Sequence, residues 1–232
     1  MKDYIIFIPL LILLSACQPT ESKDIKFDDI KDSAHRTIPA QIAQQVHFYD
    51  TNRNSISADQ FNRLLADGDY VSQQRVNQDG SEEVYLVSIE AHSKSLEGTL
   101  LPDFQLVDIE GNAYTKEDVL GKTTILTFWM TASFVCVQEL KMLNDLAQKY
   151  DKEKSFIWLA PALDQSVDLS RFLRGRNLDF SFISEQESFA QQLGLLAYPT
   201  HLIIDEKGRI RRAIVRQPQS KTLIEETLGK LL

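Results

Sequence analysis

Three features that would point directly to a function are scarce in this sequence: cysteine, clustered positive charge and long apolar runs. The 232 residues contain only two cysteines, Cys17 and Cys136. The net charge is −8 and is spread along the chain, whereas nucleic-acid binding needs a clustered basic face. Nucleic acid is therefore not an expected partner. The N-terminal apolar run, Tyr4–Leu14, is shorter than the roughly 20 residues that a membrane-spanning helix needs.

That apolar run suits the core of an export signal instead. It ends in Leu14-Ser15-Ala16-Cys17, which resembles the lipobox of bacterial lipoproteins, where the cysteine is acylated and becomes the first mature residue. The resemblance implies a signal peptide at residues 1–16, lipid on Cys17 as a membrane anchor, and a cell-envelope location facing the periplasm or the exterior. Gln18 favours the outer membrane where the bacterium has one. The alternative is a buried N-terminal helix with a chance cysteine.

Acylation of Cys17 leaves Cys136 as the only free thiol. Exported proteins live where disulfides persist, yet this chain would then form none of its own. The odd thiol therefore needs an explanation. Residues 17–37 are polar and rich in charge, which is typical of a tether between a membrane surface and a folded part.

The next segment, residues 38–95, is predicted to be a small α+β unit. A helix is expected from Pro39 to about Tyr49, since proline is tolerated at a first helical position, and a second helix from Ala58 to Ala66. Alternating runs over 69–76 and 82–90, joined by a turn, predict a β-hairpin.

Asp50, Asn52 and Asn54 are spaced as in a calcium-binding loop. However, no glycine follows Asn54, and no glutamate occupies the closing position of such a loop. An Asn-rich turn that leads to a helix capped by Ser57 explains the same residues and is the preferred interpretation.

From residue 98 to 232 the pattern predicts an α/β sandwich with a mixed central sheet. Continuous apolar runs indicate buried strands at 123–129 and 155–160, and an antiparallel hairpin is expected at 201–215. Helical spacing places helices between and after these strands, at 138–150, 168–174, 187–193 and 220–232.

The stretch FWMTASFVCVQE, Phe128–Glu139, resembles the redox motif of membrane-anchored thioredoxin-like proteins of the TlpA/ResA type, within the wider redoxin group. LPDF at 101–104 and AYPTHLIIDEKGRI at 197–210 extend the resemblance over more than half of the chain. It implies a thioredoxin-like fold at 98–232, behind the small α+β unit, and thiol–disulfide exchange on envelope proteins.

In that family a loop with a cis proline faces the redox motif and offers its backbone to an extended substrate. Pro199 fits this place, so the resemblance implies a cis Tyr198–Pro199 bond. It also implies a substrate-binding surface made of Trp129, Tyr198, Pro199 and Thr200. The partners implied are envelope polypeptides or low-molecular-weight thiols.

The motif itself departs from the family, because Ser133 stands at the position of the first cysteine. Cys136 then matches the resolving cysteine, and a serine hydroxyl forms no disulfide, so dithiol catalysis is excluded. Bulky Phe134 and Val135 are expected to shield the thiol. Glu139 matches the family's acidic residue, which implies a proton relay; a carboxylate that favours the helix dipole is the alternative.

Three functions stay open from the sequence. The first is a one-cysteine oxidoreductase, and the second is a non-catalytic module that binds envelope polypeptides. The third is a peroxide-reactive protein, because Ser133-x-x-Cys136 resembles the peroxiredoxin pattern and a helix N-terminus lowers a thiol pKa. Against it, Trp129 and Pro199-Thr200 stand where peroxiredoxins have a proline and an arginine. No cofactor and no metal are expected, because one thiol near His201 makes a weak soft-metal site.

Overall fold

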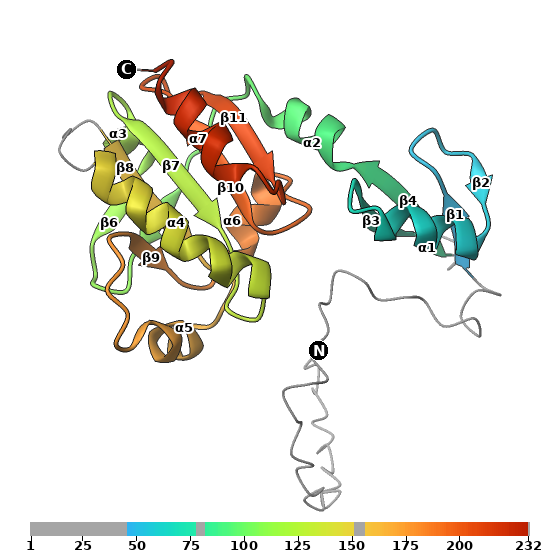
Figure 1. Cartoon of the computed structure of the whole chain (residues 1–232), viewed down its shortest axis with the longest axis horizontal. Helices are drawn as coiled ribbons and strands as arrows, with labels where there is room; N and C mark the ends of the chain where they lie inside the picture. The colour runs from blue at the N-terminus through green and yellow to red at the C-terminus, as the bar shows by residue number, and fades with distance from the viewer. Residues whose placement is uncertain (1–45, 78–81, 151–155, 232) are drawn as a thin grey trace, which may run out of the picture. The chain divides into compact units, whose positions relative to one another are not determined.

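The computed structural model describes residues 46–77, 82–150 and 156–231, which are drawn in colour in Figure 1. The predicted signal peptide, lipid anchor and tether, residues 1–37, lie outside the described residues. In the part of the chain that is described, no helix is long and apolar enough to cross a membrane.

The first described elements form a four-stranded sheet with the order β2-β1-β4-β3. They are β1 (Val46–Tyr49), β2 (Ser55–Ile56), α1 (Ala58–Ala66), β3 (Tyr70–Val76) and β4 (Glu82–Ser88). The sequence predicts a helix from Pro39 to about Tyr49, and this is wrong for Val46–Tyr49, which form the strand β1. The rest of the predicted helix lies outside the described residues. Val46 and Phe48 are buried and His47 is exposed, and this period of two suits a strand that pairs with β4.

The predicted second helix is confirmed as α1. The hydroxyl of Ser57 accepts a hydrogen bond from the backbone N–H of Gln60 at 3.2 Å and so caps its start. In the preceding turn, Asp50 Oδ1 accepts hydrogen bonds from the backbone N–H groups of Asn52 and Asn54, each at 2.8 Å. An Asn-rich turn of this kind accounts for the spacing that resembles a calcium loop.

A helix, α2 (Ile89–Leu96), follows β4 where the sequence predicts a longer strand. Ser88 explains the difference, because its hydroxyl accepts a hydrogen bond from the N–H of Ala91 at 3.3 Å and caps the helix. After the helix, Glu97 Oε1 accepts a hydrogen bond at 3.3 Å from the N–H of Ala213 on the outermost strand of the second sheet.

The second sheet is mixed and five-stranded, in the order β11-β10-β7-β8-β9. Strands β7, β8 and β9 are parallel, and β10 is antiparallel to both β7 and β11, so the predicted mixed sheet is confirmed. The elements of this part are β5 (Gln105–Val107), β6 (Ala113–Thr115), α3 (Lys116–Val119), β7 (Thr123–Phe128), α4 (Phe134–Tyr150), β8 (Phe156–Pro161), α5 (Ser166–Leu173), β9 (Ser181–Ile183), α6 (Glu187–Gln192), β10 (Thr200–Ile204), β11 (Ile210–Val215) and α7 (Ser220–Leu228). The sequence does not predict α3 and β9, which are too short to show a period.

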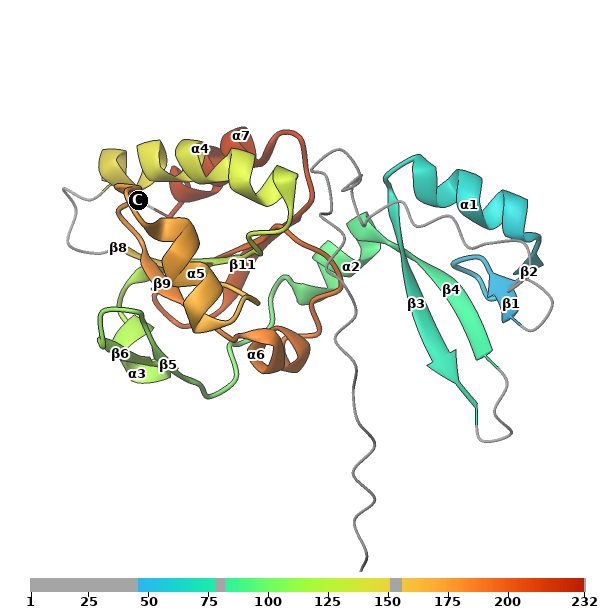
Figure 2. The same cartoon turned by 90° about the horizontal axis from the view of Figure 1, so that it is seen from below.

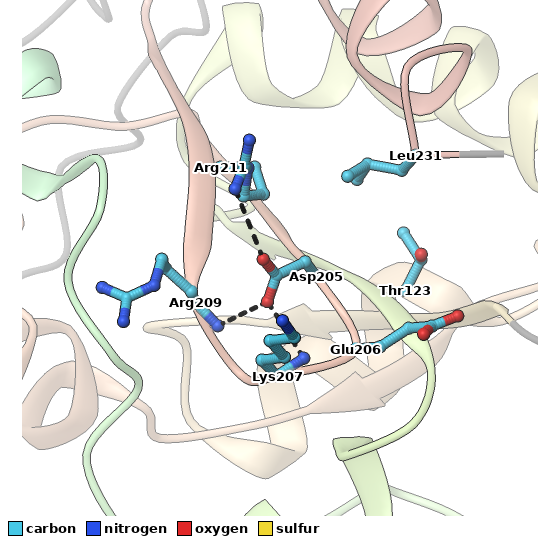
Figure 3. A pocket seen from close by; sticks show the side chains of 7 residues that line it. All are labelled: Thr123, Asp205, Glu206, Lys207, Arg209, Arg211 and Leu231. Carbon is cyan, nitrogen blue, oxygen red and sulfur yellow. Dashed lines mark hydrogen bonds and ion pairs between the residues drawn. The ribbon is translucent and has the colours of Figure 1, made fainter.

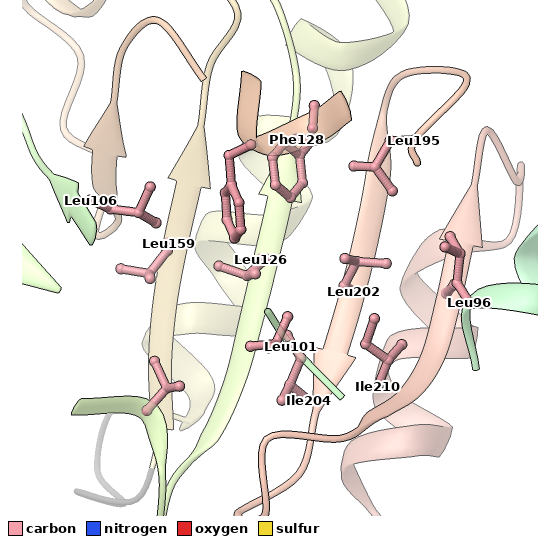
Figure 4. Packing of buried hydrophobic residues seen from close by; sticks show 14 of the residues in the cluster. Leu96, Leu101, Leu106, Leu126, Phe128, Leu159, Leu195, Leu202, Ile204 and Ile210 are labelled. Atoms are coloured by element: carbon pink, nitrogen blue, oxygen red, sulfur yellow. The ribbon is translucent and has the colours of Figure 1, made fainter. Parts of the chain in front are cut away.

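Helices α4 and α7 cover one face of the mixed sheet, and α6 with the β5–β6 hairpin covers the other (Figure 2). The side chains of β7 alternate between these two layers. Ile125 packs with residues of α4 and α7, whereas Leu126 and Phe128 face the opposite layer, which Figure 4 shows. Because β7 is buried on both faces, packing fixes the position of its carboxyl end and of the turn that follows.

Candidate functional site

The motif segment lies in the turn between the carboxyl end of β7 and the start of α4. Ser133 begins the helix, which therefore starts at Phe134, before the predicted Gln138. Its carbonyl oxygen accepts a hydrogen bond from the N–H of Val137 at 3.0 Å, and its hydroxyl accepts one from the N–H of Cys136 at 3.4 Å. Serine is among the preferred N-cap residues, so the residue at the position of the missing cysteine has a structural role.

Cys136 is buried, with 1% of its surface exposed. Phe134, which is 70% exposed, and Val135, which is 37% exposed, stand outside the buried cluster around this thiol, so their predicted shielding role stays a prediction. On the core side, buried side chains cover the thiol. The buried residues of its cluster are Trp129, Leu140, Ala160, Ala162, Leu169 and Phe182.

Burial raises the pKa of the Cys136 thiol above its usual range, and the nearby carboxylates of Glu139 and Asp164 raise this pKa further. Hydrogen bonds that involve the Ser133 hydroxyl and the backbone of Met130 act in the opposite direction without offsetting the burial. The helix-dipole argument predicts a lowered thiol pKa, which is the wrong direction here because desolvation of the thiolate is the larger effect. At neutral pH the thiolate, the form that attacks disulfides, is therefore disfavoured.

One turn further along α4, Glu139 joins a buried polar network. His201 Nε2 lies 2.8 Å from Glu139 Oε2, and His201 Nδ1 lies 3.2 Å from Thr127 Oγ1. The other carboxylate oxygen, Glu139 Oε1, accepts a hydrogen bond from Ser220 Oγ at 3.0 Å. The side chain of His201 has no exposed surface, and that of Glu139 is 17% exposed. The network therefore ties the thiol-bearing helix to β7, β10 and α7.

Two of the residues predicted to bind substrate are part of the core. Trp129 is fully buried, and its Nε1–H donates a hydrogen bond to the carbonyl oxygen of Ala160 at 3.3 Å. Thr200 is also fully buried, and its hydroxyl donates to the carbonyl oxygen of Ala197 at 2.6 Å. Both side chains therefore lie in the core, where Thr200 stabilises the Tyr198–Pro199 loop and Trp129 stabilises the end of β7.

The Tyr198–Pro199 peptide bond is cis, as the resemblance implies. Pro199 is buried, and its carbonyl oxygen accepts a hydrogen bond from the N–H of Arg216 at 3.0 Å. Tyr198 is half-buried and packs against the cluster that contains Cys136. Within the described residues, neither the backbone N–H nor the backbone C=O of Tyr198 has a hydrogen-bond partner.

Asp164 is a site residue that the sequence analysis does not identify. Its carboxylate accepts hydrogen bonds from the Thr131 N–H at 2.9 Å and from the Thr131 hydroxyl at 2.5 Å. Thr131 follows β7 and Asp164 follows β8, and the carboxyl ends of parallel strands meet at one edge of a sheet. This rule could have predicted from the sequence that Thr131 and Asp164 lie close together.

A cavity of about 350 Å³ lies at the opposite end of the sheet, where β7 begins at Thr123 (Figure 3). Its charged side chains belong to the β10–β11 hairpin. Asp205 Oδ1 accepts hydrogen bonds from the N–H groups of Lys207 and Arg209, each at 3.0 Å, and Asp205 Oδ2 lies 3.7 Å from Arg211 Nη1. The aspartate therefore stabilises the turn. Across the described ranges, no group of three or more His, Cys, Asp or Glu residues is placed to hold a metal ion.

The match to a known protein family lies in the part of the chain that forms the mixed sheet. The AhpC/TSA family model matches residues 98–213, which is half of the chain. The chain belongs to the AhpC/TSA family. Among curated relatives, the thiol-disulfide oxidoreductase ResA of Bacillus thuringiensis subsp. konkukian is 30% identical over 136 residues, which cover 58% of this chain and 78% of the relative. The thioredoxin-like protein YneN of Bacillus subtilis is 27% identical over 117 residues, which cover 50% of this chain and 69% of YneN.

Solved structures support the same fold. A Chlorobium tepidum protein, provisionally assigned as thiol:disulfide interchange protein DsbE, is similar with a TM-score of 0.54 and 25% identity. The likeness covers 58% of this chain and 96% of that protein. A thiol-disulfide oxidoreductase from Bacteroides fragilis has a TM-score of 0.51 at 20% identity, which supports the fold alone. This AhpC/TSA member therefore has a thioredoxin-like fold and belongs with the thiol–disulfide oxidoreductases.

Proposed function

We propose that the protein is a lipid-anchored, thioredoxin-like module of the cell envelope that binds polypeptides at the Tyr198–Pro199 loop and does not turn over disulfides. The burial of Cys136, with 1% of its surface exposed, carries this proposal. Exchange needs an exposed thiolate that attacks and a second thiol that resolves. Ser133 supplies no thiol, and Cys136 is both covered and held protonated.

The loop supports the binding part of the proposal. An extended chain adds to a protein through main-chain hydrogen bonds, with pockets or patches that read its side chains. Tyr198 offers an N–H and a C=O without partners within the described residues, on a loop held by Thr200 and Arg216. This chain has the cis-proline loop but lacks the thiol pair, which favours binding over disulfide exchange.

A second candidate is one-cysteine exchange, and the position of Cys136 in the first turn of α4 favours it. If that turn opens, the Cys136 thiolate attacks an oxidised low-molecular-weight thiol, forms a mixed disulfide and releases one thiolate. A second external thiol then attacks the mixed disulfide and restores Cys136. A peroxide-reactive function has less support, because the buried Trp129 stands at the position where peroxiredoxins have a proline.

Thiol labelling separates these two candidates. In a Cys17→Ser variant, Cys136 is the only thiol, and we expect iodoacetamide to alkylate it at least about 100-fold more slowly in the native protein than in urea, since reaction requires local opening. Mass spectrometry follows the adduct. A Val135→Cys/Cys136→Ala variant is the control, because position 135 is 37% exposed on the same turn and its thiol should react rapidly. A glutathione adduct on native Cys136 within minutes would contradict the non-exchanging proposal and support one-cysteine exchange.

The lipid anchor has its own test. Expressed in a bacterium with lipoprotein processing, the full chain is expected in the membrane fraction with a mass that includes acyl chains, because Leu14-Ser15-Ala16-Cys17 resembles a lipobox whose cysteine is acylated. A Cys17→Ser variant should lose the acyl mass and leave the washed membrane fraction. A Ser15→Ala variant is the control and should keep both. Unchanged membrane association without acylation in the Cys17→Ser variant would refute the proposed anchor.

A further inference from the structure

We propose that a cavity between two turns of the chain, residues 67–69 and 216–218, binds a small zwitterion, either an amino acid or a short peptide with both termini free. The cavity has a volume of about 560 Å³, within the range of small-molecule sites. None of its described lining residues belongs to the Tyr198–Pro199 loop or to the β7–α4 turn. This site is therefore distinct from the proposed polypeptide-binding surface and does not depend on it.

The cavity contains unpaired charges of both signs. Arg216 lines it together with Asp67 and Asp69. Among the residues that the structure describes, none of these three side chains forms an ion pair. Glu90 also lines the cavity, but its carboxylate is paired with Lys94. One guanidinium and two carboxylates are therefore left for a ligand.

A ligand that carries both charges satisfies both kinds of group. Its carboxylate can accept two parallel hydrogen bonds from the Arg216 guanidinium, and its ammonium group can donate hydrogen bonds to Asp67 and Asp69. A ligand that is only anionic is repelled by the aspartates, and one that is only cationic is repelled by the arginine. Free amino acids and the shortest peptides combine the two groups in a molecule small enough for the cavity.

Hydrogen bonds and packing fix both walls of the cavity. The carbonyl oxygen of Asp69 accepts a hydrogen bond from the N–H of Ile89 at 2.9 Å, which ties the acidic turn to the start of α2. The N–H of Arg216 donates to the carbonyl oxygen of Pro199 at 3.0 Å. One buried apolar cluster joins the two walls through residues of β3, α2, β11 and the segment before Tyr198, namely Val71, Ile89, Ala197 and Val215. Little order remains to be imposed when a ligand binds, which favours affinity.

The backbone of Arg216 separates a role in binding from a role in the fold. Its φ of 49° lies in the left-handed region, which glycine adopts without strain and other residues adopt at a cost. Arg212 differs, because its Nε lies 3.6 Å from Glu97 Oε1, whereas the Arg216 side chain has no ion pair in the described part of the chain. Replacing Arg216 with glycine should therefore remove the cation from the cavity without destabilising the fold.

Isothermal titration calorimetry on the full chain in detergent tests this site with alanine and with dialanine. At least one of the two should bind with a Kd below about 1 mM. The N-acetylated and the C-amidated forms of the ligand that binds each lose one charge, and each should bind at least about tenfold more weakly. Tighter binding of dialanine would identify a peptide site, and binding of alanine that is as tight or tighter would identify an amino-acid site.

Protein variants assign the binding to this cavity. Arg216→Gly and the double variant Asp67→Asn/Asp69→Asn should each weaken the ligand at least about tenfold. The urea midpoint of Arg216→Gly should be no lower than that of the unmodified chain. Asp59→Asn is the matched control and should leave the affinity unchanged, because Asp59 lies in the first turn of α1, outside the cavity.

Several results would overturn the proposed site while leaving the function at the Tyr198–Pro199 loop standing. They are no binding to the unmodified chain, equal binding of a blocked ligand, and full affinity in Arg216→Gly. A lower urea midpoint of Arg216→Gly would show that the arginine serves the fold, and it would count against the site in the same way.

Discussion

A Ser133→Cys variant is expected to gain disulfide-reductase activity. Turnover of a protein disulfide such as that of insulin should rise by at least about 100-fold over the parent, since exchange needs an attacking and a resolving thiol. The Ser133 hydroxyl already points into the first turn of α4, 3.4 Å from the N–H of Cys136. A thiol in its place is half-exposed and lies at a helix N-terminus, and both conditions favour the thiolate.

The reaction assigns a separate step to each sulfur. The thiolate introduced at position 133 attacks the substrate disulfide, releases one substrate thiolate and forms a mixed disulfide. The Cys136 thiolate then displaces the second substrate sulfur and leaves a disulfide between positions 133 and 136. Dithiothreitol in the assay reduces this disulfide, becomes oxidised itself and restores both thiols for the next turnover. Cys136 needs no access to solvent for this second step, because the sulfur that it attacks is already next to it.

Two variants control the experiment. Ser133→Ala should gain no activity and should lose about 1 kcal/mol of unfolding free energy, because it removes the helix cap. Ser133→Cys/Cys136→Ala should stop at the mixed disulfide, which mass spectrometry detects. A folded Ser133→Cys protein that turns over no faster than the parent would show that the loop and the Glu139 network have diverged as well, against the expectation.

Features that depend on local sequence are the ones that the sequence predicts correctly. The continuous apolar run before Trp129 gives β7, and Ser57 gives the start of α1. The predictions fail where pairing with a strand distant in sequence, or a local helix cap, determines the secondary structure. Ser88 turns the end of a predicted strand into a helix, and pairing with β4 turns the end of a predicted helix into β1.

The site follows the same division. Its position on the β7–α4 turn and the cis bond before Pro199 follow from the motif and the resemblance. The state of Cys136 does not, because its burial depends on side chains from several elements, and desolvation outweighs the helix dipole that the sequence shows. The partner of Glu139 is His201, 62 positions away, and only the fold brings the two together.

Replacing His201 with leucine is expected to cost about 3 kcal/mol of unfolding free energy, because it leaves a largely buried carboxylate without one of its hydrogen-bond partners. The Glu139 carboxylate would lose the ring nitrogen at 2.8 Å, and the Thr127 hydroxyl would lose the one at 3.2 Å. Urea denaturation measures the loss. Glu139→Gln keeps an acceptor for Ser220 and should cost only about 1 kcal/mol, in the range of a single hydrogen bond.

The coupling between the two side chains is the sharper measurement. In a double-mutant cycle, Glu139→Leu/His201→Leu should be more stable than the sum of the single changes predicts, by about 1 to 3 kcal/mol, because no buried carboxylate is left unpaired. The solvent-exposed Lys149–Glu225 pair, 2.7 Å apart, is the matched control and should show a much smaller coupling, because water screens exposed charges. A coupling for Glu139 and His201 as small as that of the surface pair would mean that the network does not hold the thiol-bearing helix to the sheet.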